Sequence, residues 1–317
     1  MSSSRSLHLP AILGAALCLT ASVAGCGSSS STSGSTSTTP RPGTSFSPAS
    51  RLVDGNRPPF VTGLAVNPGD RSILIATNKG LFRVPAGGGK ATPLPATVTV
   101  KKATGAFGAQ VSSLAFDRSG TLLGSGHPDR TGNGMPGFLG LISSKDGGKS
   151  WTTVSRSGLS DLHVLVVGGP GIVAYDTSLG ATIVSGDAGK TWTELSTPPA
   201  LVLDIAIDPK DPKHLLAATN DSLFASVDQG ANWKKIAAAD APRLSWSARH
   251  GLLRVVRGGQ VSSSADGGTS WKPIGSVLGD PGKLVEGADA TLYVALNNGA
   301  IFTSPDGGKS WKSLSTP

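Results

Sequence analysis

The sequence predicts an all-β fold built from repeated units of four short strands, and three observations lead to this prediction. The 317 residues include 43 glycines and 22 prolines but only 15% charged side chains, which favours short strands and tight turns over helices. The eight-residue motif "SPDGGKSW", at residues 304–311, has four earlier variants. The tryptophans that end the five copies follow one another at intervals of 41, 41, 38 and 40 residues. That period is typical of one four-stranded propeller blade.

The clearest unit covers residues 202–236. Its segments "VLDIAID", "HLLAAT", "SLFAS" and "WKKI" have the apolar character of short strands, and residues typical of turns separate them. The same template fits five other segments, residues 61–94, 111–154, 161–195, 242–274 and 283–314.

Six units predict a six-bladed β-propeller. Residues 95–110 are too few for another blade, so seven blades are the alternative only if the linker before residue 61 contributes strands. Otherwise the ring is expected to close by packing between the first and sixth units alone.

The motif is expected to form the turn between the third and fourth strands of units two to six. Its aspartate can accept hydrogen bonds from backbone N–H groups of the turn, its glycines accept positive φ, and its tryptophan can bury about 150–250 Å² on an outer strand. The first unit has "VPAGGGKATPL" at this place, without the aspartate and tryptophan. The predicted structural residues are Asp146, Trp151, Asp187, Trp192, Asp228, Trp233, Asp266, Trp271, Asp306 and Trp311.

The pattern Ser-x-Asp-x-Gly-x-[Ser/Thr/Asn]-Trp resembles the Asp-box, or BNR repeat, of sialidases and many other propellers. Five copies in register over residues 144–311 carry the resemblance. It implies the same turn between the third and fourth strands of a blade. Because every residue of the motif has a structural task, we interpret it as a joint and not as five copies of a binding site.

The amino terminus predicts a signal peptide at residues 1–25. Arg5 gives it a positive start, and residues 9–23 form an apolar stretch too short to span a membrane comfortably. The sequence Val23-Ala24-Gly25-Cys26 resembles the lipobox of bacterial lipoproteins, which implies a lipid on Cys26. The alternative is an ordinary secretory signal cleaved after Gly25.

Residues 26–50 predict a disordered tether, because their serines, threonines and prolines cannot bury enough apolar surface to fold. The propeller domain is then residues 51–317. Since Cys18 lies in the removed segment, Cys26 would be the only cysteine left and no disulfide is expected. These features predict a monomer anchored to the outer face of a bacterial cytoplasmic membrane. Lysine and arginine exceed the acidic residues by 28 to 20, but without any basic run, so no nucleic-acid partner is expected.

A ligand site is expected at one end of the channel. Turns alternate between the two ends of a blade, so the second turn of each unit and the links between units share one end, which we call the linker end. The motif and the first turns share the other, the motif end. The aligned second turns are Asn78-Lys79, His127-Pro128, Asp176-Thr177, Asn220-Asp221, Arg257-Gly258 and Asn297-Asn298.

The second unit differs from the others at the linker end. Its hairpin grows into a long loop, "GHPDRTGNGMPGF" at residues 126–138, and elaborated loops on a regular scaffold often carry function. First strands of later units begin with His163, Asp204 and Arg243, which could share the channel mouth with this loop. The candidate ligand-binding residues are His127, Asp129, Arg130, His163, Asp204 and Arg243.

Two histidines at this end raise the question of a metal site. His127 and His163, with Asp161, Asp129 or Asp176, could bind a metal or act as an acid and base pair. The plainer interpretation makes His127 a turn residue before proline and His163 a hydrogen-bonded blade residue. Because their spacing matches no metal-ligand pattern, the sequence predicts no metal and no cofactor.

Sialidase chemistry is not expected. It uses three arginines and a tyrosine activated by a glutamate, but Glu194 follows a motif on an outer strand and Tyr293 falls in a second strand. Arg83 in "LFRVP" falls in the third strand of its unit, away from the place of the similar sialidase motif. The candidates for another glycoside hydrolysis mechanism are Asp129, Asp161, Asp176 and Asp204.

A second resemblance concerns the run "SGHPDRTGNGMPGFLGLISSKDGGKSWTTVS" with the following "DLHVLVV". It is similar to bacterial, often lipid-anchored, Asp-box propellers named glycosyl hydrolases after their fold. Those relatives tend to have histidines where this chain has Val61-Thr62-Gly63 and Asn78-Lys79. We predict a binding module for an envelope glycan or a protein partner. The alternatives are a glycoside hydrolase and an assembly factor for a membrane complex.

Overall fold

The computed structural model describes residues 60–100, 106–129, 135–169 and 171–315, with backbone alone at residues 106 and 107. The chain divides into two compact parts, and all of these residues belong to the larger part, residues 48–317. The predicted signal peptide, Cys26 and tether lie outside the described residues, and so does Arg130. Among the described residues, no helix has the length and apolar character needed to cross a bilayer.

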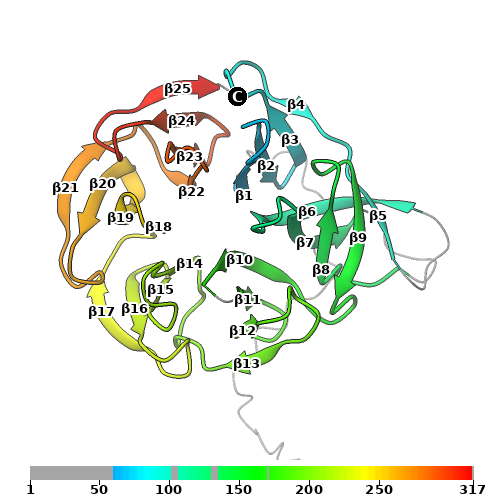
Figure 1. Cartoon of the computed structure of the whole chain (residues 1–317), viewed down its shortest axis with the longest axis horizontal. Helices are drawn as coiled ribbons and strands as arrows, with labels where there is room; N and C mark the ends of the chain where they lie inside the picture. Colours follow the sequence, from blue (N-terminus) through cyan, green and yellow to red (C-terminus); the bar gives the residue numbers. More distant parts are fainter. Residues whose placement is uncertain (1–59, 101–105, 130–134, 170, 316–317) are drawn as a thin grey trace, which may run out of the picture. The chain divides into compact units, whose positions relative to one another are not determined.

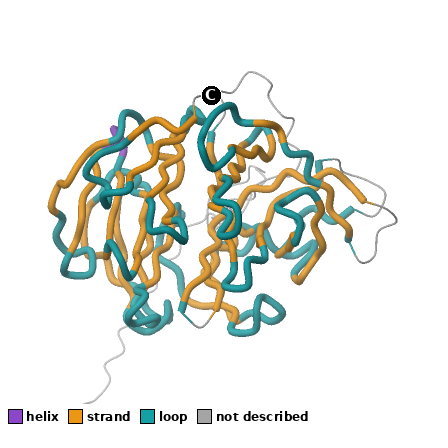
Figure 2. Tube along the Cα trace, turned by 45° about the horizontal axis from the view of Figure 1, so that its top comes forward, coloured by secondary structure: helices purple, strands orange, loops and turns teal. Residues whose placement is uncertain are grey.

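The described residues form strands joined by turns, with one three-residue helix, η2 (Arg257–Gly259) (Figure 2). Five sheets have four antiparallel strands each, in chain order. The first three are β1 (Val61–Val66), β2 (Ile73–Thr77), β3 (Gly80–Val84), β4 (Thr92–Pro93); β10 (Leu162–Gly168), β11 (Gly171–Asp176), β12 (Ala181–Ser185), β13 (Thr193–Leu195); β14 (Asp204–Ile207), β15 (Leu215–Ala218), β16 (Ser222–Ser226) and β17 (Lys234–Ala238). The others are β18 (Arg243–Ser247), β19 (Gly251–Val255), β20 (Gln260–Ser264), β21 (Lys272–Ser276); β22 (Pro281–Glu286), β23 (Leu292–Leu296), β24 (Ile301–Ser304) and β25 (Lys312–Ser315).

The second unit is different, because a fifth strand closes it into a barrel. Its strands are β5 (Thr97–Thr99), β6 (Ala106–Phe116), β7 (Leu122–Pro128), β8 (Leu141–Ser144) and β9 (Ser150–Ser155). Strand β5 pairs antiparallel with β6 and parallel with β9, where Val98 lies opposite Trp151. Strand β5 was not expected, although Thr97-Val98-Thr99-Val100 alternates as a half-buried strand does, because residues 95–110 were treated only as too few for another blade.

The units form a ring around their inner strands, β1, β6, β10, β14, β18 and β22, which are called the first strands (Figure 1). Each first strand contacts the first strand of the next unit, and β22 contacts β1. Six clusters of buried hydrophobic side chains lie between neighbouring units, one at each junction. The fold is therefore an all-β propeller.

The ring closes by packing between the first and last units, as expected, but not by packing alone, because the Gly89 N–H of the first unit donates to the Leu314 carbonyl of the last at 3.0 Å. Val61 and Ile73 of the first unit share a buried cluster with Tyr293 and Ile301 of the last. The sheet of β22–β25 contains only these four strands among the described residues. Apolar burial between the terminal units is thus the main force that closes the ring.

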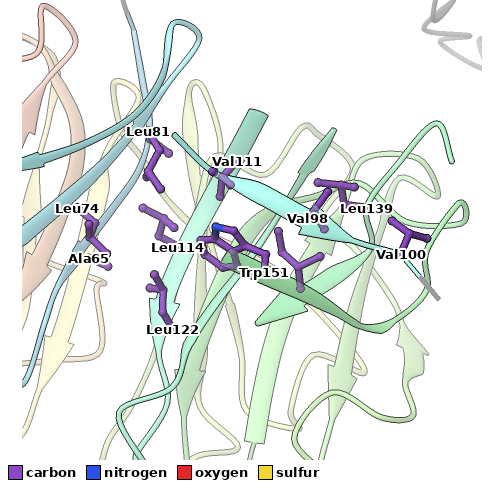
Figure 3. Packing of buried hydrophobic residues seen from close by; sticks show 13 residues of the cluster. Ala65, Leu74, Leu81, Val98, Val100, Val111, Leu114, Leu122, Leu139 and Trp151 are labelled. Carbon is purple, nitrogen blue, oxygen red and sulfur yellow. The ribbon is translucent and has the colours of Figure 1, made fainter. Parts of the chain in front are cut away.

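The cluster between the first and second units surrounds Trp151 (Figure 3). Leu74 and Leu81 come from the first unit, and Val98 and Leu122 from the second. Trp151 lies in β9 and is only 1% exposed, because β5 covers the edge of its strand. The other four motif tryptophans precede their outer strands by one residue and are half-buried. The expectation that all five lie on outer strands is correct for Trp151 alone.

Four of the motifs lie between the third and fourth strands of their sheets, and the first copy lies between β8 and β9. A network of hydrogen bonds shapes each turn. In the first copy, Ser144 Oγ donates to Asp146 Oδ1 at 2.8 Å and accepts from the Gly148 N–H at 2.8 Å. Asp146 Oδ1 also accepts from the backbone N–H groups of Lys149 and Ser150, at 3.0 and 2.9 Å. The aspartate therefore accepts hydrogen bonds from backbone N–H groups that the turn would otherwise leave unpaired.

Two positions of the motif require positive φ. The fifth residue is glycine in every copy and has φ between 82° and 94°. The fourth residue is Ala188 in one copy and Gln229 in another, with φ of 61° and 62°, the left-handed region that other residues can enter at a cost. The fifth position is therefore always glycine, whereas the smaller φ at the fourth position allows other residues there.

Acid should destabilise the protein through these turns. Hydrogen bonds from the residue four positions further on hold the pKa of Asp187, Asp228 and Asp266 at about 2, below the usual 3.8. Because the folded pKa is the lower one, these carboxylates stabilise the fold above about pH 4 and lose that effect as the pH falls to about 2.

We therefore expect the melting temperature to fall between about pH 5 and pH 2, and to fall less steeply in Asp228→Asn. Circular dichroism melts at constant ionic strength check this. Parallel curves for the two proteins would contradict it.

Candidate functional site

The first strands of all six units line a central channel of about 680 Å³. The walls are mainly the apolar residues of these strands, but several polar side chains interrupt them. Those that line the channel include His163, Asp204, Lys283 and Glu286. The channel is thus a solvent-accessible cavity with ionisable side chains on its wall.

Three of the candidate side chains meet at the linker end, between the second and third units. His127 comes from the end of β7, Asp161 directly precedes β10, and His163 is the second residue of β10. His127 Nε2 lies 3.1 Å from Asp161 Oδ1, and His163 Nε2 lies 3.1 Å from Asp161 Oδ2. We call these three residues the His–Asp–His cluster.

Asp161 is buried, with 2% of its surface exposed, yet it is held as a carboxylate. Burial alone would raise its pKa, but hydrogen bonds with His127 and His163, and the positive charge that these rings carry when protonated, lower the pKa well below the usual range. A residue with this environment cannot store a proton near neutral pH. It can instead accept hydrogen bonds or bind a cation.

Two residues at the end of β11 and directly after it hold Asp161 in place. Asp176, fully buried, accepts from the Asp161 N–H at 3.1 Å and from the Ser178 N–H at 3.0 Å. Thr177 Oγ1 donates toward Asp161 Oδ2 at 3.1 Å. Asp176 therefore positions the cluster and is not presented to a ligand.

Asp204 and Arg243 have structural partners of their own. Lys283 Nζ lies 3.0 Å from Asp204 Oδ1, and the Leu244 N–H donates to Asp204 Oδ2 at 3.0 Å. Arg243 Nε donates to the Gly282 carbonyl at 2.6 Å, which links the fifth unit to the sixth. Burial lowers the pKa of Arg243, and the charge of Asp204 opposes this. These contacts tie β14, β18 and β22, the first strands of the last three units, together at the channel mouth.

The remaining candidates are placed differently from the expectation. Asp129 is exposed and its side chain lies over Gly108 of β6, where an added Cβ would meet its carboxylate. His127 and Pro128 end strand β7 and do not form a turn, because the long loop begins after them. Lys283 was missed as a site residue, although it occupies the position in its unit that Arg243 has in the preceding one.

The residues considered for sialidase chemistry lie where the sequence analysis expected. Glu194 is on β13, Tyr293 on β23 and Arg83 on β3, so none of them is on a first strand. Glu286 is on β22 and lines the channel. These residues therefore do not form a tyrosine and glutamate pair at one channel mouth.

No family model matches the sequence. The dispase autolysis-inducing protein of Streptomyces mobaraensis is 28% identical over 189 residues, which are 59% of this chain and 42% of that protein. The chain thus spans less than half of the length of this relative.

Two solved structures have similar folds. A gluconolactonase from Xanthomonas campestris is 12% identical and aligns with a TM-score of 0.54, and the alignment covers 78% of this chain and 86% of the gluconolactonase. An ancestral GH74 enzyme is 14% identical, covers 80% and 38%, and has a TM-score of 0.52. At these identities the similarity shows the propeller fold alone.

Proposed function

We propose that the chain is an extracytoplasmic lipoprotein, anchored through Cys26, whose propeller is a non-catalytic binding module for a protein partner or an envelope glycan. The ligand would dock on the linker end of the channel. The five hydrogen-bonded motif turns support membership of the Asp-box propellers. The closed ring of five four-stranded sheets and one barrel-like unit supports a count of six blades, the second of them modified.

The observation that carries the proposal is the distribution of exposed apolar side chains. Six large hydrophobic residues are exposed among the described residues, and five of them lie in links between units, before the first strand, or in a second turn: Phe60, Leu159, Leu179, Leu201 and Leu278. By the strand alternation, all five are at the linker end. Val227, in a motif turn, is at the motif end.

Exposed leucines around one rim favour a protein partner over a glycan, because protein interfaces are built around buried apolar anchors. Ser178 Oγ donates to the Leu159 carbonyl at 2.9 Å, so the segments that carry Leu159 and Leu179 lie side by side. The Streptomyces relative is named for an effect on another protein, dispase. A protein partner is consistent with that name.

The environment of the carboxylates argues against glycoside hydrolysis. A general acid needs a raised pKa, whereas the pKa of Asp161 is lowered. Asp204 is paired with Lys283, and Asp176 accepts backbone hydrogen bonds. Asp161 therefore lacks the environment of a proton donor, and Asp176 and Asp204 already have partners within the protein.

Leu278→Lys tests the docking face. Leu278 is 84% exposed at the linker end, and Val227 is 72% exposed at the motif end, so Val227→Lys is a matched control. Burying a charge at an apolar anchor costs about 2 kcal/mol or more, so we expect at least a tenfold loss of partner capture with Leu278→Lys and no change with Val227→Lys. Quantitative mass spectrometry of proteins cross-linked in the producing bacterium measures this.

Equal capture by both variants would contradict the docking face. If the captured proteins are subunits of one membrane complex, the assembly-factor alternative gains support. A panel of fluorogenic glycosides decides the hydrolase alternative. We expect no turnover, and turnover that Asp161→Asn or Asp204→Asn abolishes would replace the binding proposal by a hydrolase.

A further inference from the structure

The geometry points to a divalent transition-metal site, with Zn²⁺ as the probe of choice, formed by His127, Asp161 and His163. This inference goes beyond the proposed function and does not depend on it. Two imidazoles and one carboxylate are a common protein ligand set for zinc, with the fourth position left to water or a ligand. The sequence favours a plain hydrogen-bonded arrangement, because the spacing of the two histidines matches no metal motif. The fold brings them together from different blades.

The separations suit a metal ion. The ligand atoms of the three residues all lie within 4.8 Å of one another, and each histidine Nε2 is 3.1 Å from a carboxylate oxygen. A tetrahedral Zn²⁺ with bonds of about 2.0–2.2 Å keeps its ligand atoms about 3.3–3.6 Å apart. Movement of about 1 Å therefore converts the present arrangement into a coordination sphere.

A second interaction orients the His127 ring as in known metal sites. Its Nδ1 lies 3.2 Å from the Gly137 carbonyl, which directs Nε2 toward Asp161. With Nδ1 donating to this carbonyl, the Nε2 lone pair of a neutral ring is available to a metal ion beside Asp161 Oδ1. A proton on Nε2 would instead give a hydrogen bond to the same oxygen, so the experiment must separate a metal ion from a protonated ring.

The burial of the three residues suits entry and exchange of an ion. The Asp161 side chain is 3% exposed and fixed by Thr177, whereas the His163 side chain is 47% exposed and lines the channel. A rigid carboxylate with an accessible histidine gives a site that an ion can reach from the channel. The open position would face the same channel.

The other described histidines provide matched controls. His214 Nδ1 is 3.8 Å from Asp208 Oδ2, and His250 Nε2 is 2.8 Å from the Ala290 carbonyl. Among the described residues, only the His–Asp–His cluster brings three potential ligand groups together. His214→Gln thus removes a histidine beside a carboxylate without touching the cluster.

The test is calorimetric titration of the full chain with Zn²⁺, in detergent and without a histidine tag. Cys18→Ser and Cys26→Ser, present in every sample, remove the competing thiols, and a chelator first strips bound metal. We expect one ion per chain, at least about 100-fold weaker binding in His163→Gln, and unchanged binding in His214→Gln. Since His163 is half-exposed, His163→Gln should fold, and its metal-free melting temperature checks this.

A titration with Co²⁺ gives a second readout that does not depend on His163→Gln. A four-coordinate site with histidine ligands should give visible absorption bands distinct from those of aqueous Co²⁺, and Asp161→Asn should remove them. Zn²⁺ binding no tighter than that of His163→Gln would overturn the proposal and leave a protonated hydrogen-bonded cluster. Loss of binding in His214→Gln equal to that in His163→Gln would overturn it as well.

Discussion

Replacing Trp151 by alanine should lower the free energy of unfolding by about 3–5 kcal/mol. Trp151 is 1% exposed and lies at the centre of the cluster that joins the first two units, so its loss leaves a cavity that rigid neighbours cannot fill. Trp311 ends a motif with the same hydrogen bond, from its Nε1 to the carbonyl of the glycine three residues earlier, but it is only half-buried. Trp311→Ala should therefore cost about 1–2 kcal/mol.

Urea unfolding followed by circular dichroism measures both values. The comparison isolates the effect of burial, because the two tryptophans share the turn and its hydrogen bonds. Equal losses in the two variants would mean that β5 does not seal the second unit in solution.

Gly88→Ala should destabilise the protein by about 2–4 kcal/mol, whereas Gly87→Ala should change stability by less than about 0.5 kcal/mol. Gly88 has φ of 86°, and an added Cβ would lie 2.4 Å from the Leu314 carbonyl oxygen on the last strand. The next residue, Gly89, donates its N–H to the same oxygen at 3.0 Å. The substitution pushes the turn between β3 and β4 away from β25, at the junction between the first and last units.

Gly87 is the control, because an added Cβ there meets no atom within 4 Å. Thermal melts of both variants check the prediction, and limited proteolysis near residue 314 shows whether the last strand has separated. If Gly88→Ala were as stable as Gly87→Ala, this contact would contribute nothing to ring closure.

The repeat made most of the fold predictable from the sequence. A tryptophan every 40 residues or so fixed the third and fourth strands, and the segment "SLFAS" coincides with β16. The run Thr97-Val98-Thr99-Val100 alternates as a half-buried strand does, but the parallel pairing of β5 with β9 could not be read from the sequence. Such pairing depends on tertiary contacts, which leave no local pattern of their own.

The candidate site was predictable in part. Alignment of the repeats placed His127 and His163 at the same end of the ring, since equivalent positions in each blade face the same way. The contact with Asp161 could not be read from the spacing, because its two partners come from different sheets. Asp204 was chosen by the same alignment, but its pairing with Lys283 spans two units and needed the structure.

The closure of the second unit by β5 has a consequence for solubility. The outermost strand of a blade exposes unpaired backbone groups, and charged residues or prolines there discourage strands of other molecules from adding to the sheet. Five outer strands carry such residues, namely Pro93, Glu194, Lys234, Lys235, Lys272, Pro273 and Lys312. The outer strand β9 has none of them, and it is the one whose edge β5 occupies. A chain that lost β5 would thus expose its least protected edge and invite polymerisation.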